Sequence, residues 1–361
     1  MEFLQRTLKW AERNERHLGA IVFVAGFVTD LVTFGVLSIA LVNIAFLAYL
    51  VVAIICTFGT HLVSHRSETP TLTRRISSVM FPLVAQYSIG SLLSGCLIFY
   101  TKSANVFASW PFLLFLVLIF FGNEYFRTYY KHVAFQVVLL FFAMYAYAIF
   151  ALPLVVNQLG PWVFVCSTVL SCVSFALFLY LLKRTRPEEF RKSFQYILPG
   201  SLSVLFLMNV FYFTGIMPPI PLTLPESGVY HSFAREDGNY VVSAEAEQPW
   251  WNVSEHVVHH VPGTPLYAYS SVSAPVRFST YIVHVWERYD APKQKWVERS
   301  RVSFNITGGR DGGYRGYSEL ADAEEGKWRV RIQTPEGQTI GRLSFTVVTV
   351  SEEPLLHLEQ K

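Results

Sequence analysis

The stretch Gly308–Ser318, GGRDGGYRGYS, holds five glycines and two arginines within eleven residues, a composition that could cradle a phosphate. A phosphate loop of the Walker type needs Gly-Lys-Ser/Thr and a helix behind it, whereas Gly313 precedes Tyr314, and no dinucleotide spacing of glycines fits. The residues that follow, YRGYSEL, read as a β-strand, so no helix N-terminus is available to hold an anion. We therefore interpret the stretch as a glycine-rich bend or bulge between two strands.

The arginines of this bend remain candidates for ligand contact. Arginine makes bidentate contacts with acidic groups, so Arg310 and Arg315, with Tyr314 beside them, could bind a glycan carboxylate or a lipid phosphate. The alternative is that both arginines form ion pairs at strand ends.

Two motifs with histidine point to other chemistry. In HVVHH, His256 and His260 have the i, i+4 spacing of a helical metal pair, but Val257 stands where a zincin requires glutamate. A surface turn is the better interpretation, and we predict no metal site. In HVWERYD, His284 and Trp286 share one face of a predicted strand. They belong either to the core or to an aromatic platform of the kind that binds sugars.

A third group of candidates consists of polar residues in otherwise apolar runs: Asp30, Asn43, Gln86, Glu124 and Asn209. Ionisable groups inside a membrane are costly, and this makes them functional candidates by default. Asp30 could bind a cation or relay a proton, or it could lie near a short turn and meet water. Glu124 stands at helical spacing near Arg127, which favours a structural pair, and the amides favour interhelical hydrogen bonds.

The sequence contains no recognisable catalytic set. No Ser-His-Asp order follows from spacing, and no pair of carboxylates stands out. All four cysteines fall in apolar runs without a Cys-x-x-Cys pair, so they are best interpreted as small apolar residues. We expect no cofactor and no nucleic-acid partner.

The elements that must position these candidates fall into two parts that meet near residue 220. Residues 1–218 hold 15 Lys/Arg and 8 Asp/Glu, whereas residues 219–361 hold 14 and 18. A membrane-spanning helix takes about 20 apolar residues. After a cytoplasmic segment, 1–17, we predict an α-helical transmembrane bundle of about seven spans, at roughly 18–36, 39–60, 76–100, 106–122, 133–156, 161–182 and 196–217.

The distribution of basic residues predicts the orientation of this bundle. Fourteen Lys/Arg lie in the N-terminal segment and in the second-to-third, fourth-to-fifth and sixth-to-seventh connections, all on one side of a seven-span arrangement. The opposite short loops hold only Lys102. Basic residues stay in the cytoplasm, so we predict a cytoplasmic N-terminus and a periplasmic C-terminal part.

The C-terminal part reads as a β-domain behind a proline-rich linker, 218–227. About seven strands with turn residues between them, over 228–350, are typical of an antiparallel sandwich of the immunoglobulin type. In KWRVRIQ, period-two alternation places Trp328, Val330 and Ile332 on the buried face. We expect residues 246–262 to form a short helix or loop, and 351–361 a tail.

Several motifs together resemble a known family: YFTGIMPPIPLTLPESGVYHSF, IVHVWERYD, GGRDGGYRGYS and GKWRVRIQTPEGQTIGRLSFTV. They are similar to bacterial membrane proteins that end in domain of unknown function family 2914, over roughly residues 205–350. Upstream, only the layout of the spans and GNEYFR resemble that group. The resemblance implies a bacterial inner-membrane protein with a periplasmic sandwich domain. It implies no activity and no catalytic residues.

Three functions are compatible with these features. In the first, the β-domain binds an envelope glycan, lipid or protein while the helices anchor it in the lipid bilayer. In the second, an integral-membrane enzyme acts on a lipid-linked substrate with Asp30, Glu124 or His61. In the third, a transporter lines a cavity at the membrane midplane with the polar residues of its spans. The first is the interpretation that the sequence favours.

Overall fold

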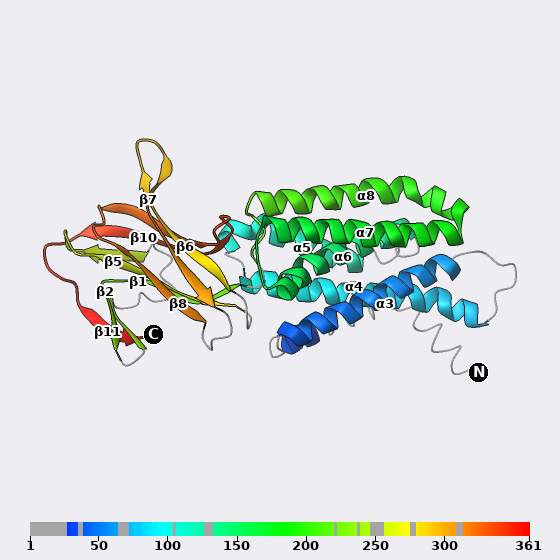
Figure 1. Ribbon diagram of the computed structural model, residues 1–361, viewed down its shortest axis with the longest axis horizontal. Coiled ribbons are helices and arrows are strands. Elements are labelled where there is room, and N and C mark those ends of the chain that lie inside the picture. The colour runs from blue at the N-terminus through cyan, green and yellow to red at the C-terminus, as the bar shows by residue number, and fades with distance from the viewer. Residues whose placement is uncertain are drawn as a thin grey trace. The chain divides into compact units, whose positions relative to one another are not determined.

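The computed structural model describes residues 27–34, 39–63, 72–103, 106–125, 133–219, 222–236, 239–245, 256–274, 279–307 and 313–361. The chain divides into two compact units (Figure 1): a helical unit, which extends to Thr214, and a β-domain, which comprises Gly215–Lys361 with two short upstream segments. The predicted order of a helical part followed by an all-β part is therefore confirmed.

The helical unit contains a helix at residues 27–34 and six longer helices: α3 (Ile39–Val63), α4 (Leu72–Ser103), α5 (Val106–Tyr125), α6 (Val133–Val156), α7 (Pro161–Thr185) and α8 (Pro187–Phe213). By length and composition, five of the described helices could cross a membrane, namely α3, most of α4, α6, α7 and α8. The apolar part of α5 is shorter, over Ser109–Gly122. The first predicted span, 18–36, lies largely outside the described residues.

The last predicted span is corrected by the structure. We expected residues 183–192 to connect two spans, but α7 continues to Thr185 and α8 begins at Pro187. Proline is tolerated at the first helical position because the N–H that it lacks would have no partner there. Glu188 and Glu189 in the first turn also favour a helix start. A search for apolar windows could not detect these polar turns.

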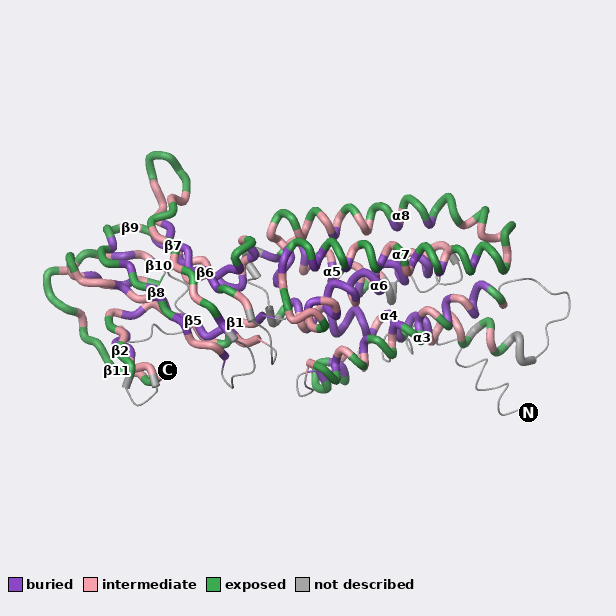
Figure 2. Tube along the Cα trace, in the orientation of Figure 1, coloured by how far each residue is buried: buried purple, intermediate pink, exposed green. Residues whose placement is uncertain are grey.

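Within the helical unit, α6 is the central helix. Its apolar window is 78% buried, against 17% for that of α8. In Figure 2, α8 is accordingly coloured largely as exposed. Rings pack around it: Phe150 lies 5.1 Å from Phe46 of α3, and Phe141 lies 4.5 Å from Phe175 of α7, measured between ring centroids. The outer helices instead expose large apolar side chains, such as Phe206 on α8.

The β-domain consists of three sheets (Figure 1). The central sheet has the order β1 (Thr223–Tyr230), β5 (Leu266–Ser273), β8 (Tyr314–Leu320). The large sheet has the order β4 (His256–His260), β10 (Thr339–Thr349), β9 (Gly326–Gln333), β6 (Ser279–Asp290), β7 (Lys295–Thr307). The outer sheet has the order β11 (Leu356–Gln360), β3 (Asn239–Glu245), β2 (Ser232–Glu236). Pairing is antiparallel except between β4 and β10.

The central sheet lies between the other two and packs on both. One face forms a core with the large sheet around Trp286, Val330 and Phe345. The other face packs against the outer sheet, where Tyr269 meets Val242. The predicted alternation along β9 is confirmed, because Trp328, Val330 and Ile332 are all buried. Burial of such side chains is the main stabilising contribution to a fold of this kind.

The predicted arrangement of about seven strands is corrected to eleven strands among the described residues. HVVHH is strand β4 and not a surface turn, and the expected tail contains β11, which pairs with β3. The expected linker contains the start of β1. Pro225 is tolerated there because β1 is an edge strand with a register shift between Thr223 and Glu226.

Candidate ligand-binding cavity of the β-domain

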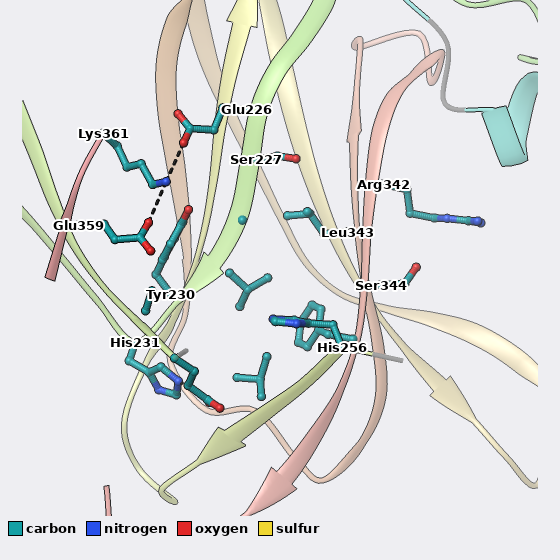
Figure 3. Close-up of a pocket in the computed structure, with 16 residues that line it drawn as sticks. Glu226, Ser227, Tyr230, His231, His256, Arg342, Leu343, Ser344, Glu359 and Lys361 are labelled. Carbon is teal, nitrogen blue, oxygen red and sulfur yellow. Dashed lines mark hydrogen bonds and ion pairs between the residues drawn. The ribbon is translucent and has the colours of Figure 1, made fainter. Parts of the chain in front are cut away.

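A cavity of about 460 Å³ lies where edge strands of all three sheets meet. The strands β1, β4 and β11 each end a sheet, and each contributes side chains to it (Figure 3). Strand β1 supplies an unbroken run, Glu226–Tyr230, and His231 follows it. Gly228 permits the local arrangement, since a Cβ there would lie 2.5 Å from the Tyr230 hydroxyl. The Tyr230 side chain can therefore fold back along its own strand.

Two carboxylates converge on one ammonium group at this cavity. Lys361 Nζ lies 2.7 Å from Glu226 Oε1 and 2.8 Å from Glu359 Oε2, as Figure 3 shows. Burial lowers the pKa of Lys361, but hydrogen bonds to Glu226 and Glu359 outweigh this effect and raise it above its ordinary value. The same bond from Lys361 lowers the pKa of Glu359. Counted formally, the two carboxylates and one ammonium of the trio sum to a net charge of −1.

A third carboxylate, Glu245, is held by two histidines. His231 Nε2 donates to Oε1 at 2.9 Å, and His259 donates its ring Nδ1–H to Oε2 and its backbone N–H to Oε1, both at 2.7 Å. Burial would raise the pKa of Glu245, but the bonds from His259 and His231 together lower it. His231 and Glu245 line the cavity, so its wall presents fixed hydrogen-bonding groups at two places.

Each carboxylate named above is already paired with a cation or with histidines, so these charged groups are held in place on the cavity wall. Over the described ranges, no group of three His, Cys, Asp or Glu side chains is placed to hold a metal ion. The Arg342 side chain points away from the ion-paired trio (Figure 3). The cavity is therefore polar, and Tyr230 forms part of its wall.

The predicted aromatic platform at Trp286 and His284 is not present, because both side chains are fully buried. Trp286 Nε1 donates to Ser318 Oγ at 2.9 Å, and His284 bonds Ser318 Oγ at 2.9 Å and Ser270 Oγ at 2.7 Å. Both residues therefore belong to the core, which is one of the two interpretations that the sequence left open. Burial lowers the pKa of His284 to about 4, so the imidazole is neutral.

Of the other β-domain candidates, Tyr314 and Arg315 are described, and neither lines the cavity. Arg310 is outside the described residues. Tyr314 packs against a hydrophobic cluster, and Arg315 Nη1 donates to the backbone oxygen of Lys361 at 2.8 Å. The stretch YRGYSEL is strand β8, as predicted, and Gly313 turns the chain at a φ of 83°.

Among the polar candidates of the helical unit, Asn209 has a hydrogen-bond partner on another helix. Asn209 Nδ2 donates to Tyr145 Oη of α6 at 3.1 Å and to its own helix, which confirms the interhelical bond predicted for an amide. Asp30 and Gln86 are buried, and the buried Oδ1 of Asn43 has no partner among the described residues. Glu124 lies in α5, and the structure describes only its backbone.

Of the residues that line the cavity, sequence reasoning weighed only His256, and it missed the charged trio. Glu226 lay in the expected linker, and Glu359 and Lys361 lay in the expected tail. The two parts of the trio are more than 130 positions apart, and the packing of the outer sheet on β1 brings them together. A weak signal was present in LHLE, residues 356–359, where apolar and polar residues alternate as they do in a strand.

Comparison with known proteins identifies one family. The model described as "Protein of unknown function (DUF2914)" matches residues 279–347, which run from the start of β6 into β10. This confirms the resemblance predicted from the sequence for the C-terminal part. No curated protein matches. One solved structure that matches is the Pseudomonas fluorescens alkylpurine DNA glycosylase AlkC bound to DNA containing an abasic site analog. It has 9% identity and a TM-score of 0.23, and the match covers 85% of this chain and 98% of that chain. A similarity this low supports no argument about fold or function.

Proposed function

We propose that this chain is a bacterial inner-membrane protein whose helices anchor a periplasmic β-domain, and that the β-domain binds an envelope glycan. The placement of the basic residues supports this orientation, because fourteen of the fifteen in residues 1–218 fall on one side of a seven-span arrangement. The five helices that are long and apolar enough to cross a membrane support the anchor. The proposal includes an immunoglobulin-like sandwich as the fold type of the β-domain.

The observation that carries the binding function is the composition of the cavity wall. The wall presents the charged groups of Glu226, Glu359 and Lys361, and the ion pairs between them hold these groups in place. Ligand sites combine apolar surface with a small number of well-placed polar groups. A sugar has both a C–H face and a hydroxyl edge. The trio offers partners for the hydroxyls, and Val229 and Leu343, which line the same cavity, offer apolar surface for the C–H face.

A lipid or a protein partner fits the same cavity less well. An acyl chain requires an enclosed apolar channel, whereas this wall carries charged side chains from β1 and β11. A phosphate headgroup would meet the net negative charge of the Glu226–Lys361–Glu359 trio. The two alternatives, an enzyme and a transporter, would use Asp30, Glu124 or the polar residues of the spans. Among the described side chains of this group, no arrangement favours either alternative over the binding function.

The test is a titration of the full chain in nanodiscs with soluble glycan strands released from peptidoglycan. Glu226→Gln and Glu359→Gln remove one acceptor charge each from the trio and should weaken binding at least about tenfold, since charge-assisted hydrogen bonds are the stronger ones. Glu352→Gln, an exposed residue outside the cavity wall, is the matched control and should bind as the unaltered protein does. Saturable binding of anionic vesicles or of periplasmic peptides, without binding of glycan strands, would contradict the proposal.

A further inference from the structure

A second aromatic surface lies on the face of the central sheet that packs against the outer sheet. The register pairs Tyr267 of β5 with Glu319 of β8, and Tyr269 with Tyr317, so these four side chains share one face. Phe233 of β2 stacks on Tyr317 with ring centroids 4.1 Å apart and an interplanar angle of 26°. We name the four rings of Phe233, Tyr240, Tyr267 and Tyr317 the tyrosine platform.

The platform packs on a buried ring and is partly exposed to solvent. Tyr269 is fully buried and lies 6.0 Å from Phe233, measured between centroids, so it supports the platform from the core. Tyr317 is 44% exposed, and the other three rings are half-buried. Aromatic side chains that are held on a sheet and still meet solvent supply contact area without a large entropy cost on binding.

Polar groups of both signs flank the rings. Glu319 is exposed and is the register partner of Tyr267. On the other flank, the Cζ atom of Arg235 lies 6.0 Å from the centroid of the Tyr240 ring. Hydrogen-bond donors and acceptors thus border an apolar surface. A pyranose ring matches this pattern, because it stacks its C–H face on an aromatic ring and directs hydroxyls outward. An anionic headgroup or a nucleic acid would require an excess of positive charge, which these two flanking residues do not provide.

A row of rings joins the platform to the cavity. Tyr230, which lines the cavity, lies 6.3 Å from Tyr269, and Tyr269 contacts Phe233 of the platform. Tyr230 and Tyr267 are also register partners on adjacent strands. Tyr230 and Tyr269 are buried, so the link at the surface is Tyr240: its backbone pairs with that of Lys361, which lines the cavity, through hydrogen bonds of 2.8 and 3.2 Å. A ligand of several linked sugars that passes Tyr240 contacts both places at once.

We propose that the tyrosine platform is a second glycan subsite, which stacks sugar rings of the same strand whose other residues occupy the cavity. This inference rests on the proposed function and extends it to a ligand of several sugars. It predicts that affinity rises with the length of the glycan, because a short sugar reaches only one subsite while a long strand gains the second contact within the same complex.

The experiment compares short and long glycan strands from peptidoglycan on the full chain in nanodiscs. Tyr317→Ala removes the most exposed ring and should weaken binding of long strands by about tenfold, since one aromatic stack contributes an effect of that order. Tyr317→Phe keeps the ring and should bind within about threefold of the unaltered chain. Tyr281→Ala removes a ring that is 57% exposed on the large sheet, outside the platform, and should have no effect.

The outcomes separate this inference from the function on which it rests. If Tyr317→Ala binds long strands as the unaltered chain does while Glu359→Gln does not, the platform is no subsite and the cavity function stands. If the unaltered chain binds no glycan, both are wrong. A melting curve of each variant shows whether it still folds. If Tyr317→Ala does not fold, Tyr267→Ala replaces it as the variant that lacks a platform ring. Equal affinity for short and long strands would also overturn the inference.

Discussion

Replacing Ser318 by alanine tests how the β-domain core is stabilised. Ser318 Oγ accepts a hydrogen bond from the Trp286 indole, which can only donate, and Ser318 also bonds His284 Nδ1. In one tautomer the serine hydroxyl donates to Nδ1 and His284 Nε2–H donates to Ser270 Oγ; in the other tautomer both bonds to His284 run the opposite way, and the contacts of Ser318 are the same. All four side chains are buried. Ser318→Ala thus leaves two buried polar atoms without partners, whereas Ser270→Ala leaves one.

The magnitude follows from this count. Each buried polar atom that loses its partner costs about 1–3 kcal/mol, so Ser318→Ala should lower the free energy of unfolding by about 2–6 kcal/mol and Ser270→Ala by about half as much. With a urea dependence of about 2 kcal/mol per molar, the unfolding midpoints should fall by roughly 2 M and 1 M. Ser303→Ala, at an exposed position of β7, is the control and should leave the midpoint unchanged.

The assay is pulse proteolysis of the membrane-embedded chain at increasing urea, which measures the folded fraction of the β-domain without removing it from the helices. Equal midpoints for the Ser318→Ala and Ser270→Ala variants would refute the shared role of the Ser318 hydroxyl. Midpoints of both variants equal to that of Ser303→Ala would refute the buried network altogether.

Two further predictions concern the same core. Burial lowers the pKa of His284 from 6.5 to about 4, so the unfolded chain binds a proton that the folded chain does not between these values. Stability should therefore fall by up to about 3 kcal/mol as the pH drops from 6.5 to 4, and His284→Gln should flatten that part of a stability-against-pH curve. Gly316→Ala would place a Cβ 2.1 Å from the Phe304 ring and should cost about 1–3 kcal/mol through overpacking. A urea midpoint equal to that of the unaltered chain would show that the ring moves aside freely.

The sequence predicted what depends on local pattern. Helix positions followed from apolar windows, and the inward face of β9 followed from the alternation of Trp328, Val330 and Ile332. It did not predict β4, because a histidine-rich segment reads as polar. His260 is buried, and its ring accepts a hydrogen bond from the backbone N–H of Ala323, a residue 63 positions away.

The candidate site depended still more on long-range pairing. Each member of the Glu226–Lys361–Glu359 trio reads as an ordinary surface charge, since charged residues are mostly exposed. Only the pairing of β11 with β3, and the packing of that sheet on β1, brings the three together. The strand after the glycine-rich stretch was predicted correctly, but the close approach of Gly316 to Phe304 could be seen only in the folded chain.

The most direct measurement of the central claim is the side of the membrane on which the β-domain lies. In a chain whose native cysteines are replaced, Lys293→Cys places a thiol in the exposed β6–β7 hairpin, and Lys192→Cys places one in the first turns of α8. With the outer membrane permeabilised, an impermeant maleimide should label Lys293→Cys in intact cells and Lys192→Cys only after the inner membrane is broken. Labelling of Lys192→Cys in intact cells, with Lys293→Cys protected, would contradict a periplasmic β-domain.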